Sequence, residues 1–555
     1  MPAYLARVSV RITGEIRWHY IYNKGGRSAF MRFKDTFVST IDYGRMTSYH
    51  LYLVSQTIKK CNFAFVKKKK MLNIPLIYKV IGTLLQLEAL LLAVCLGMGY
   101  WFCEDKHLMF ILPTIVALVV GTMLRFFGRH AENRMGRRDG FLIVSLTWVV
   151  FSAIGMLPFL ISGCQPRVAA AFFESMSGFT TTGATVFFDI DALPRSILLW
   201  RTMTHWIGGM GIVFFTIAVL PNMGGGEMKL FSAEATGLKI GKLHPRISTT
   251  ARWMWSLYLA LTLACIGAYV LCGMSPFDAL CHGLSTIGTG GFSTHTNSVA
   301  WFQSDLIEWV TTLFMFLASI NCTLLYLFFI KHRFRDVFHD DELRCFLTIF
   351  FVAVVSVMCI LMYADHLDFV TALRSSLFNV ASLQSTTGFT DEDFMTWHPT
   401  VWLILTMISI IGACAGSTSG GLKCVRILIV WRLTKAEFKK MLHPHAVLPV
   451  RINNTTITSQ TARTVFVFFV VYFMLIMLST FCMVAMELPM LDAFGLAISS
   501  FSNIGPSMGH FIGPLGSWGA LSDSILWINS FLMLAGRLEV FSLLLPLTPA
   551  FWRDE

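Results

Sequence analysis

Charged side chains are scarce in this sequence. Asp, Glu, Lys and Arg together make up 14% of its 555 residues, whereas a soluble domain carries about 25%. Hydrophobic residues make up 55% of the chain. This balance excludes an ordinary soluble globular domain and predicts a protein that crosses a membrane several times.

The sequence also lacks the usual signatures of metal centres and enzymes. No Cys-x-x-Cys pair occurs among its 13 cysteines, most of which lie in apolar runs. They are typical of small buried hydrophobic residues and not of metal ligands or a disulfide framework. Nucleophile elbows, zinc-helix motifs and paired intramembrane aspartates are absent as well. The sequence therefore predicts no enzyme and no cofactor bound by this chain.

Positive charge is in excess, with a formal net charge of +12. Such a charge can indicate nucleic acid, but in a membrane protein it is expected in cytoplasmic loops. Basic clusters follow every second predicted span, at 129–138, 229–252, 331–344 and 432–451. This alternation predicts a multi-pass membrane protein, surrounded by lipid, with both termini cytoplasmic and no nucleic-acid partner.

The first 70 residues contain no long apolar run and end in four lysines, directly before Met71. No cleavable signal peptide is therefore visible in them. Two interpretations of this basic N-terminal extension, 1–70, stand. In the one we favour, Met71 is the natural start of the protein. In the other, the segment is a cytoplasmic tail whose lysines bind anionic lipid.

One short pattern occurs four times between apolar runs: a serine, five residues, a glycine, one residue, and then serine or threonine. The four copies begin at Ser177, Ser285, Ser382 and Ser499, and their glycines are Gly183, Gly291, Gly388 and Gly505. A period of about 100 residues is too long for a solenoid repeat. It predicts one supersecondary module used four times around an axis.

Long apolar segments set the predicted boundaries, since a spanning helix needs about 20 apolar residues. In each module a long apolar helix (M1) precedes a shorter segment that carries the glycine pattern (P), and a second apolar helix (M2) follows. The P segments are too short to span, so we expect them to be re-entrant and to line a central pore. The predicted organisation is the extension at 1–70, two leading transmembrane helices at 71–138, repeat 1 at 139–225, repeat 2 at 226–335, repeat 3 at 336–440 and repeat 4 at 441–555. The predicted fold is thus an all-α polytopic membrane protein, with two leading helices plus four M1-P-M2 repeats around a pseudo-fourfold central pore and ten spanning helices in all.

The glycine of each copy permits backbone angles that other residues avoid, so that carbonyl oxygens can replace an ion's hydration shell. The candidate filter residues are Thr181, Thr182 and Gly183, Thr289, Gly290 and Gly291, Thr386, Thr387 and Gly388, and Asn503, Ile504 and Gly505. No carboxylate lies within these stretches, whereas a site for divalent ions is expected to use a ring of Asp or Glu. A carbonyl ring suits a weakly hydrated monovalent ion, chiefly K+.

Four motifs make the sequence similar to a known family. They are 173–183 (FESMSGFTTTG), 205–211 (HWIGGMG), 416–423 (GSTSGGLK) and 536–539 (GRLE). On these motifs, residues 71–555 resemble the TrkH/KtrB superfamily of potassium-translocating subunits, most closely its TrkH branch in the bacterial Trk potassium uptake system. The resemblance implies four M1-P-M2 units around a pore, with one filter glycine in each unit. A glycine at position 183 keeps the potassium-type pattern, because related plant transporters with serine there favour Na+.

A run of small residues interrupts the predicted M2 of repeat 3 at 412–421, and so many small residues will not hold a straight helix. Gly412, Gly416, Gly420 and Gly421 lie in this run. Close helix packing is the alternative explanation for them. Arg537 lies within the last M2, where a charge must face the pore or a partner. The resemblance implies that the 412–421 loop is a gate beneath the filter and that Arg537 is an electrostatic barrier beside it; a helix-packing ion pair is the alternative for Arg537.

These observations predict potassium uptake, with K+ as the transported ion held at filter carbonyls. The resemblance further implies a homodimer and a cytosolic TrkA-type nucleotide-binding regulatory subunit, because this chain has no nucleotide site of its own. Two alternatives stay open: the potassium-binding subunit of an ATP-driven pump, and a Na+-permeable relative. Arg201 and His205, four residues apart on one face of the first M2, are interpreted as structural.

Overall fold

The computed structural model describes residues 72–131, 135–211, 247–446, 448–453 and 455–553, together with two short strands near the N-terminus. The chain divides into two units, Met1–Lys70 and Met71–Glu555. In the first unit, β1 (Arg11–Ile12) pairs antiparallel with β2 (Ile16–Arg17). The rest of the predicted extension 1–70, the end of M2 in repeat 1 (212–221) and the basic loop that follows it lie outside the described residues.

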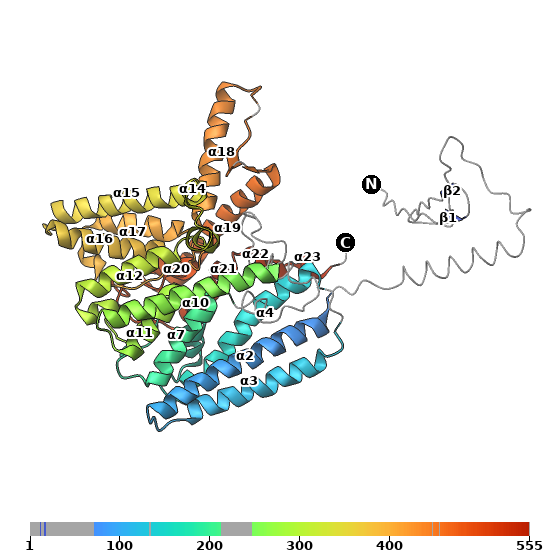
Figure 1. Ribbon diagram of the computed structural model, residues 1–555, viewed down its shortest axis with the longest axis vertical. Coiled ribbons are helices and arrows are strands. Elements are labelled where there is room, and N and C mark those ends of the chain that lie inside the picture. The colour runs from blue at the N-terminus through green and yellow to red at the C-terminus, as the bar shows by residue number, and fades with distance from the viewer. Residues whose placement is uncertain are drawn as a thin grey trace, which may run out of the picture. The chain divides into compact units, whose positions relative to one another are not determined.

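The second unit is built almost entirely from helices (Figure 1). Its two leading helices are α2 (Ile74–Trp101) and α3 (Leu108–Phe127), both within the region 71–138 predicted for them. The Asn73 side chain accepts a hydrogen bond from the Leu76 N–H at 3.3 Å, which caps the start of α2. Gly82 and Gly121 let the two backbones come into contact, since a Cβ on either would clash with the other's carbonyl oxygen.

The four predicted repeats follow in order. The M1 helices are α4 (Arg137–Gly155) continued by α5 (Leu157–Ile161), α10 (Ile247–Leu271), α15 (Asp341–Tyr363) and α19 (Ser459–Val484). The P helices are α6 (Val168–Phe179), α11 (Pro276–Gly288), α16 (Phe369–Gln384) and α20 (Met490–Ser502). The M2 helices are α7 (Arg195–Met210), α12 (Asp305–Ala318) with α13 (Cys322–Phe329), α17 (Pro399–Ile411) with α18 (Cys424–Leu442), and α21 (Asp523–Arg537) with α22 (Phe541–Leu547).

The P helices cannot span a membrane. They contain 12 to 16 residues and rise about 1.5 Å per residue, which falls short of a hydrocarbon core about 30 Å thick. They are nonetheless among the most buried segments: eleven of the twelve residues of α6 are buried. A short buried helix that ends in a glycine turn agrees with the re-entrant segments predicted from the sequence.

The M2 helices differ from the prediction in one respect. The sequence predicted a break only in repeat 3, and the structure has that break between α17 and α18. The M2 segment of repeat 2 is also bent, by 105° between α12 and α13, and that of repeat 4 by 115° between α21 and α22. Six helices of the described residues qualify as single spans by length and composition, and eight do if each bent pair counts as one.

The remaining described elements are short connections. They are α14 (Phe334–Phe338), α23 (Pro549–Trp552), the 3-10 helices η2 (Ser298–Phe302), η3 (Phe394–Thr396) and η4 (Trp518–Ala520), and the hairpin β3 (Arg451–Ile452) with β4 (Thr455–Thr456). One large apolar core joins the leading helices to repeats 1 and 4, and a second lies within repeats 2 and 3. Helix α18 extends away from the other helices of its unit (Figure 1).

Candidate functional site

Every P helix ends in the same turn. The N–H of the residue before the glycine donates to the carbonyl of the pattern's serine, at 2.8 to 3.0 Å in all four repeats. The residue two positions before each glycine has a left-handed backbone. These residues are Thr181 (φ +55°), Thr289 (+53°), Thr386 (+57°) and Asn503 (+56°). This combination is a Schellman motif, which closes the carboxyl end of a helix. The carbonyl ends of four helices are therefore directed toward one region by four equivalent turns.

The four glycines bring these turns together in a ring. Gly183, Gly291, Gly388 and Gly505 have φ values of +83°, +83°, +79° and +99°. A Cβ on any of them would overlap a carbonyl oxygen of the next repeat. The overlaps are Gly183 with Gly290, Gly291 with Thr387, Gly388 with Ile504, and Gly505 with Thr182. Because the fourth contact returns to the first repeat, these eight of the twelve candidate filter residues form one closed ring.

A pocket lies on one side of this ring. All four glycines line it, together with residues that follow them, such as Thr185, Ser293 and Thr390. The residues that precede the glycines do not line this pocket, and two of them, Thr386 and Asn503, lie against Gly420 of the 412–423 segment. The ring therefore separates a pocket side from a loop side. Backbone carbonyls ordered around an axis, without a carboxylate among the filter residues, form a site suited to a monovalent cation.

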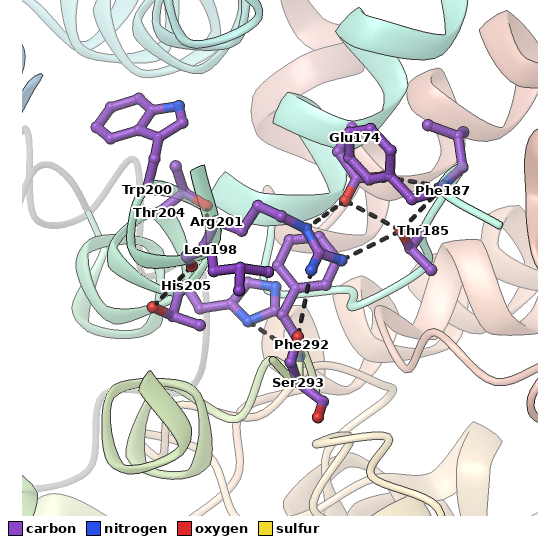
Figure 2. Close-up of polar contacts among 12 residues, drawn as sticks. Glu174, Thr185, Phe187, Leu198, Trp200, Arg201, Thr204, His205, Phe292 and Ser293 are labelled. Atoms are coloured by element: carbon purple, nitrogen blue, oxygen red, sulfur yellow. Dashed lines mark hydrogen bonds and ion pairs between the residues drawn. The ribbon is translucent and has the colours of Figure 1, made fainter. Parts of the chain in front are cut away.

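A buried ion pair supports the ring in repeat 1 (Figure 2). Arg201 Nε lies 2.8 Å from Glu174 Oε1, and both side chains are almost fully buried. Arg201 also donates to the Ser293 carbonyl at 3.2 Å and to Thr185 Oγ1 at 3.1 Å, on the carboxyl sides of two filter glycines. The second oxygen of Glu174 accepts from the Val186 N–H at 2.8 Å. Glu174 and Arg201 thus fix the segments that leave the ring in repeats 1 and 2.

His205 contributes to the same support. Its ring stacks on Phe292, with ring centroids 4.0 Å apart (Figure 2). Its Nδ1 lies 3.1 Å from Ser285 Oγ. These contacts agree with the structural role predicted for Arg201 and His205. The sequence analysis did not identify Glu174 as the partner of Arg201, although Glu174 lies in the 173–183 motif.

The predicted loop in repeat 3 is present as the segment 412–423, here called the intramembrane loop. Gly412, Gly416 and Gly421 adopt positive φ values of +68°, +77° and +74°. The two ends meet at a narrow neck, because the Leu422 and Lys423 N–H groups donate to the carbonyls of Ile410 and Ile411 at 3.1 and 3.0 Å. The small residues therefore form a compact loop and not only a helix-packing surface.

The bend in repeat 2 holds one side of this loop. The Cys414 N–H donates to the Ser319 carbonyl at 3.2 Å, and the Cys322 N–H donates to the Gly416 carbonyl at 3.1 Å. Glu342, at the start of α15, joins the loop to α18: its Oε1 accepts from the N–H groups of Ala415 in the loop at 2.6 Å and of Val425 in α18 at 3.2 Å. Sequence reasoning missed these contacts, because acidic residues at 340–342 are typical of any helix start.

Arg537 lies beside this loop, as expected. Its Nη1 donates to the Thr418 carbonyl at 2.8 Å, and its Nη2 donates to the carbonyls of Gly208 and Gly209. The neighbouring Glu539 forms an ion pair with Arg426 of α18 instead. The structure thus brings Arg537 into contact with the intramembrane loop, and these three hydrogen bonds all run to backbone carbonyls.

Two carboxyl groups on the pocket side of the ring have perturbed acidity. Burial and the nearby negative charge of Glu392 raise the pKa of Asp391 to about 8. Burial acts in the same direction at Asp191, but hydrogen bonds from His295 and Thr296 outweigh it and lower the pKa of that carboxyl. Asp191 lies 2.6 Å from His295 Nδ1, which ties the loops of repeats 1 and 2 together.

Comparisons with known proteins agree with this geometry. A sequence model of the TrkH family, described as cation transport protein, matches residues 106–552. The Trk system potassium uptake protein TrkH of Vibrio parahaemolyticus is 36% identical over 490 residues, covering 86% of this chain and 99% of that protein. The protein of the same name from Escherichia coli K12 is 37% identical over 444 residues, covering 79% and 91%. The crystal structure of the potassium transporter TrkH from Vibrio parahaemolyticus aligns with a TM-score of 0.78 at 34% identity, covering 86% of this chain and 99% of that one.

Proposed function

Because the chain belongs to the TrkH family of cation transport proteins, we propose that it is the potassium-translocating membrane subunit of a Trk uptake system. Like its relatives, it is a transport protein and not an enzyme. Its several apolar helices make it a multi-pass protein. The observation that carries the proposal is the closed ring of filter glycines, in which each repeat's carbonyl lies against the glycine of another.

The proposed ion site is the ring itself. The carbonyl oxygens of Thr182, Gly290, Thr387 and Ile504 are the first candidates, because each lies beside a glycine of the neighbouring repeat. Thr181, Thr289, Thr386 and Asn503 supply a second layer of carbonyls on the loop side. Dehydrated K+ is stabilised by several such dipoles at once, and Gly183 leaves room for the Gly290 carbonyl that a side chain would displace. This arrangement favours K+ over Na+.

The proposed gate is the intramembrane loop together with Arg537. Gly412, Gly416, Gly420 and Gly421 give the loop its path, and Arg537 holds it through Thr418. The guanidinium lies on the loop side of the ring, where a fixed positive charge opposes the passage of a cation. Opening then requires the loop and Arg537 to separate.

We further propose that the chain lies in the bacterial inner membrane with both termini cytoplasmic, as a homodimer, and that a TrkA-type nucleotide-binding subunit regulates it. Helix α18 supports the proposed regulation by a cytosolic subunit. It continues from the intramembrane loop, and its last two turns carry Lys435, Lys439 and Lys440. A partner that moves α18 therefore acts on the loop directly.

Growth of a potassium-uptake-deficient bacterium tests this function. Expression of the wild-type chain together with its cytosolic regulator should restore growth at low K+, and Gly183→Arg, which fills the ring, should not. Rescue only in the presence of an added ATPase subunit indicates the pump alternative. Rescue of sodium uptake without potassium selectivity indicates the Na+-permeable alternative. No rescue by well-expressed wild-type protein rejects the proposal.

A further inference from the structure

Three of the four residues at the left-handed position of the turns make different side-chain hydrogen bonds. Thr289 donates its hydroxyl to its neighbour's carbonyl, that of Gly288, at 2.7 Å. Asn503 donates its amide to Thr182 Oγ1 at 3.0 Å and to the Met533 carbonyl at 2.9 Å. Thr386 instead accepts, at its Oγ1, a hydrogen bond of 2.7 Å from the N–H of Gly420. In repeat 3, therefore, the filter turn is bonded directly to the intramembrane loop.

The loop also packs against the turn of repeat 4. A Cβ on Gly420 would overlap the Ser502 carbonyl and lie 3.1 Å from the Asn503 Cβ. Gly420 is therefore wedged between the filter turns of repeats 3 and 4, and only a glycine fits there. The loop has no intervening layer of side chains at this point, so a displacement of Gly420 must change the environment of both turns.

Arg537 makes a similar contact with repeat 1. Its acceptor Gly208 packs so closely on the first filter turn that a Cβ there would overlap the Phe179 carbonyl and lie 3.2 Å from Thr181 Cγ2. Gly536, next to Arg537, lies equally close to the Phe501 carbonyl. The loop is thus in contact with the filter turns of repeats 3 and 4, and Arg537 is linked to that of repeat 1 through Gly208.

We propose that Thr386 is a positioning residue that couples the intramembrane loop to the carbonyl ring, so that gate position and ion selectivity change together. This inference rests on the proposed function of the loop as a gate. A β-branched residue adopts a φ of +57° only when its surroundings hold it there. The Gly420 hydrogen bond is one of the contacts that hold Thr386, and loop withdrawal breaks it. Because coupling is reciprocal, K+ in the ring must in turn bias the position of the loop.

The test compares Thr386→Val, which has the same shape but no acceptor, with Thr386→Ser, which keeps the hydroxyl. Purified variants in liposomes are assayed for Rb+ influx and for the ratio of Rb+ to Na+ influx. The Val variant leaves the buried Gly420 N–H without its acceptor in the closed state, so influx should rise roughly 5- to 30-fold and the Rb+/Na+ ratio should fall. The Ser variant should behave as wild type in both.

Thr312→Val is the matched control, because the Thr312 hydroxyl donates only within its own helix, to the Glu308 carbonyl at 2.8 Å. It should change neither measurement. A Thr386→Val variant with wild-type influx and wild-type ratio overturns the coupling, and so does a loss of influx at an unchanged ratio, which a purely structural role predicts. Absence of Rb+ influx in the wild type rejects the proposed function itself, so the two failures are distinguishable.

A second measurement needs no substitution. Cys414 is a buried cysteine of the intramembrane loop, and Cys103 is exposed and far from it in the sequence. Alkylation of both by N-ethylmaleimide in the wild-type protein is followed by peptide mass spectrometry, in K+ and in choline. Coupling predicts that the rate at Cys414 depends on K+ while the rate at Cys103 does not. Equal rates at Cys414 in the two media overturn the proposal.

Discussion

The guanidinium of Arg537 donates a hydrogen bond to the Thr418 carbonyl, 2.8 Å away and 119 residues earlier in the chain. The bond joins the last M2 of the protein to the intramembrane loop of repeat 3. The same guanidinium reaches the Gly208 and Gly209 carbonyls at the end of the first M2. One side chain thus fastens three repeats together on the loop side of the filter ring.

Replacing Arg537 by alanine should therefore open the pathway. The change removes charge-assisted hydrogen bonds worth about 1.5–3 kcal/mol each, so we expect Rb+ influx into liposomes to rise at least about tenfold. Arg537→Lys should give an intermediate influx, because an ammonium keeps the charge but not the planar fork that reaches two segments. Arg463→Ala, which removes an exposed arginine of α19, is the control and should leave influx unchanged. Unchanged influx in Arg537→Ala would contradict the gate.

Gly183→Ser should weaken selection of K+ over Na+. A serine Cβ would overlap the Gly290 carbonyl, and φ at this position is +83°, so the ring must distort to accept it. The measurement is the ratio of Rb+ to Na+ influx, which we expect to fall severalfold. Gly267→Ala in α10 is the matched control, because a Cβ there meets open space. A wild-type ratio in Gly183→Ser would show that the ring does not set selectivity.

Deletion of residues 412–421 should raise the open probability. The neck bonds between 410–411 and 422–423 already hold the two ends of the loop together, so the helices can be joined with little rearrangement. Single-channel recording or Rb+ influx would report the change, and the tilt of α18 should be conserved. If the deletion variant folds and conducts as the wild type does, the loop is not a gate.

Asp391 predicts a pH dependence of stability. Its folded-state pKa of about 8 lies above its ordinary value near 3.8, because burial and Glu392 disfavour the charged form. The neutral carboxyl therefore leaves stability intact below pH 3.8, and stability falls as pH rises from there through 8. Asp391→Asn removes this penalty and can still accept from Asn379, which donates to Oδ1 at 2.8 Å. We expect a higher Tm than wild type at pH 9 and little difference at pH 4; equal Tm values at pH 9 would contradict this.

The sequence was sufficient to predict the four turns, because each needs a glycine and the spacing from serine to glycine is the same in every copy. It also predicted the break at 412–421, where small residues are concentrated. From the sequence, however, positive φ angles were predicted only at the glycines. The structure places them also at Thr181, Thr289 and Thr386, where the Schellman hydrogen bonds hold residues that disfavour them.

The bends in repeats 2 and 4 were missed for a related reason. Neither contains glycine or proline, and both depend on contacts from distant parts of the chain. Asn321 begins α13 by accepting from the Thr323 N–H at 2.7 Å, and Gly416 of the loop packs on it. In repeat 4 the Phe541 N–H donates to the Glu539 carbonyl across Val540, whose φ of +64° forms a rare, strained γ-turn. No local pattern in the sequence predicts either bend.

Selective Rb+ influx into liposomes containing the purified wild-type chain and its cytosolic regulator tests the central claim most directly. The ring of carbonyls predicts that K+ on the outside suppresses Rb+ influx at far lower concentration than Na+ does. Suppression by both ions at the same concentration, or no influx from well-folded protein with its regulator present, would contradict the account.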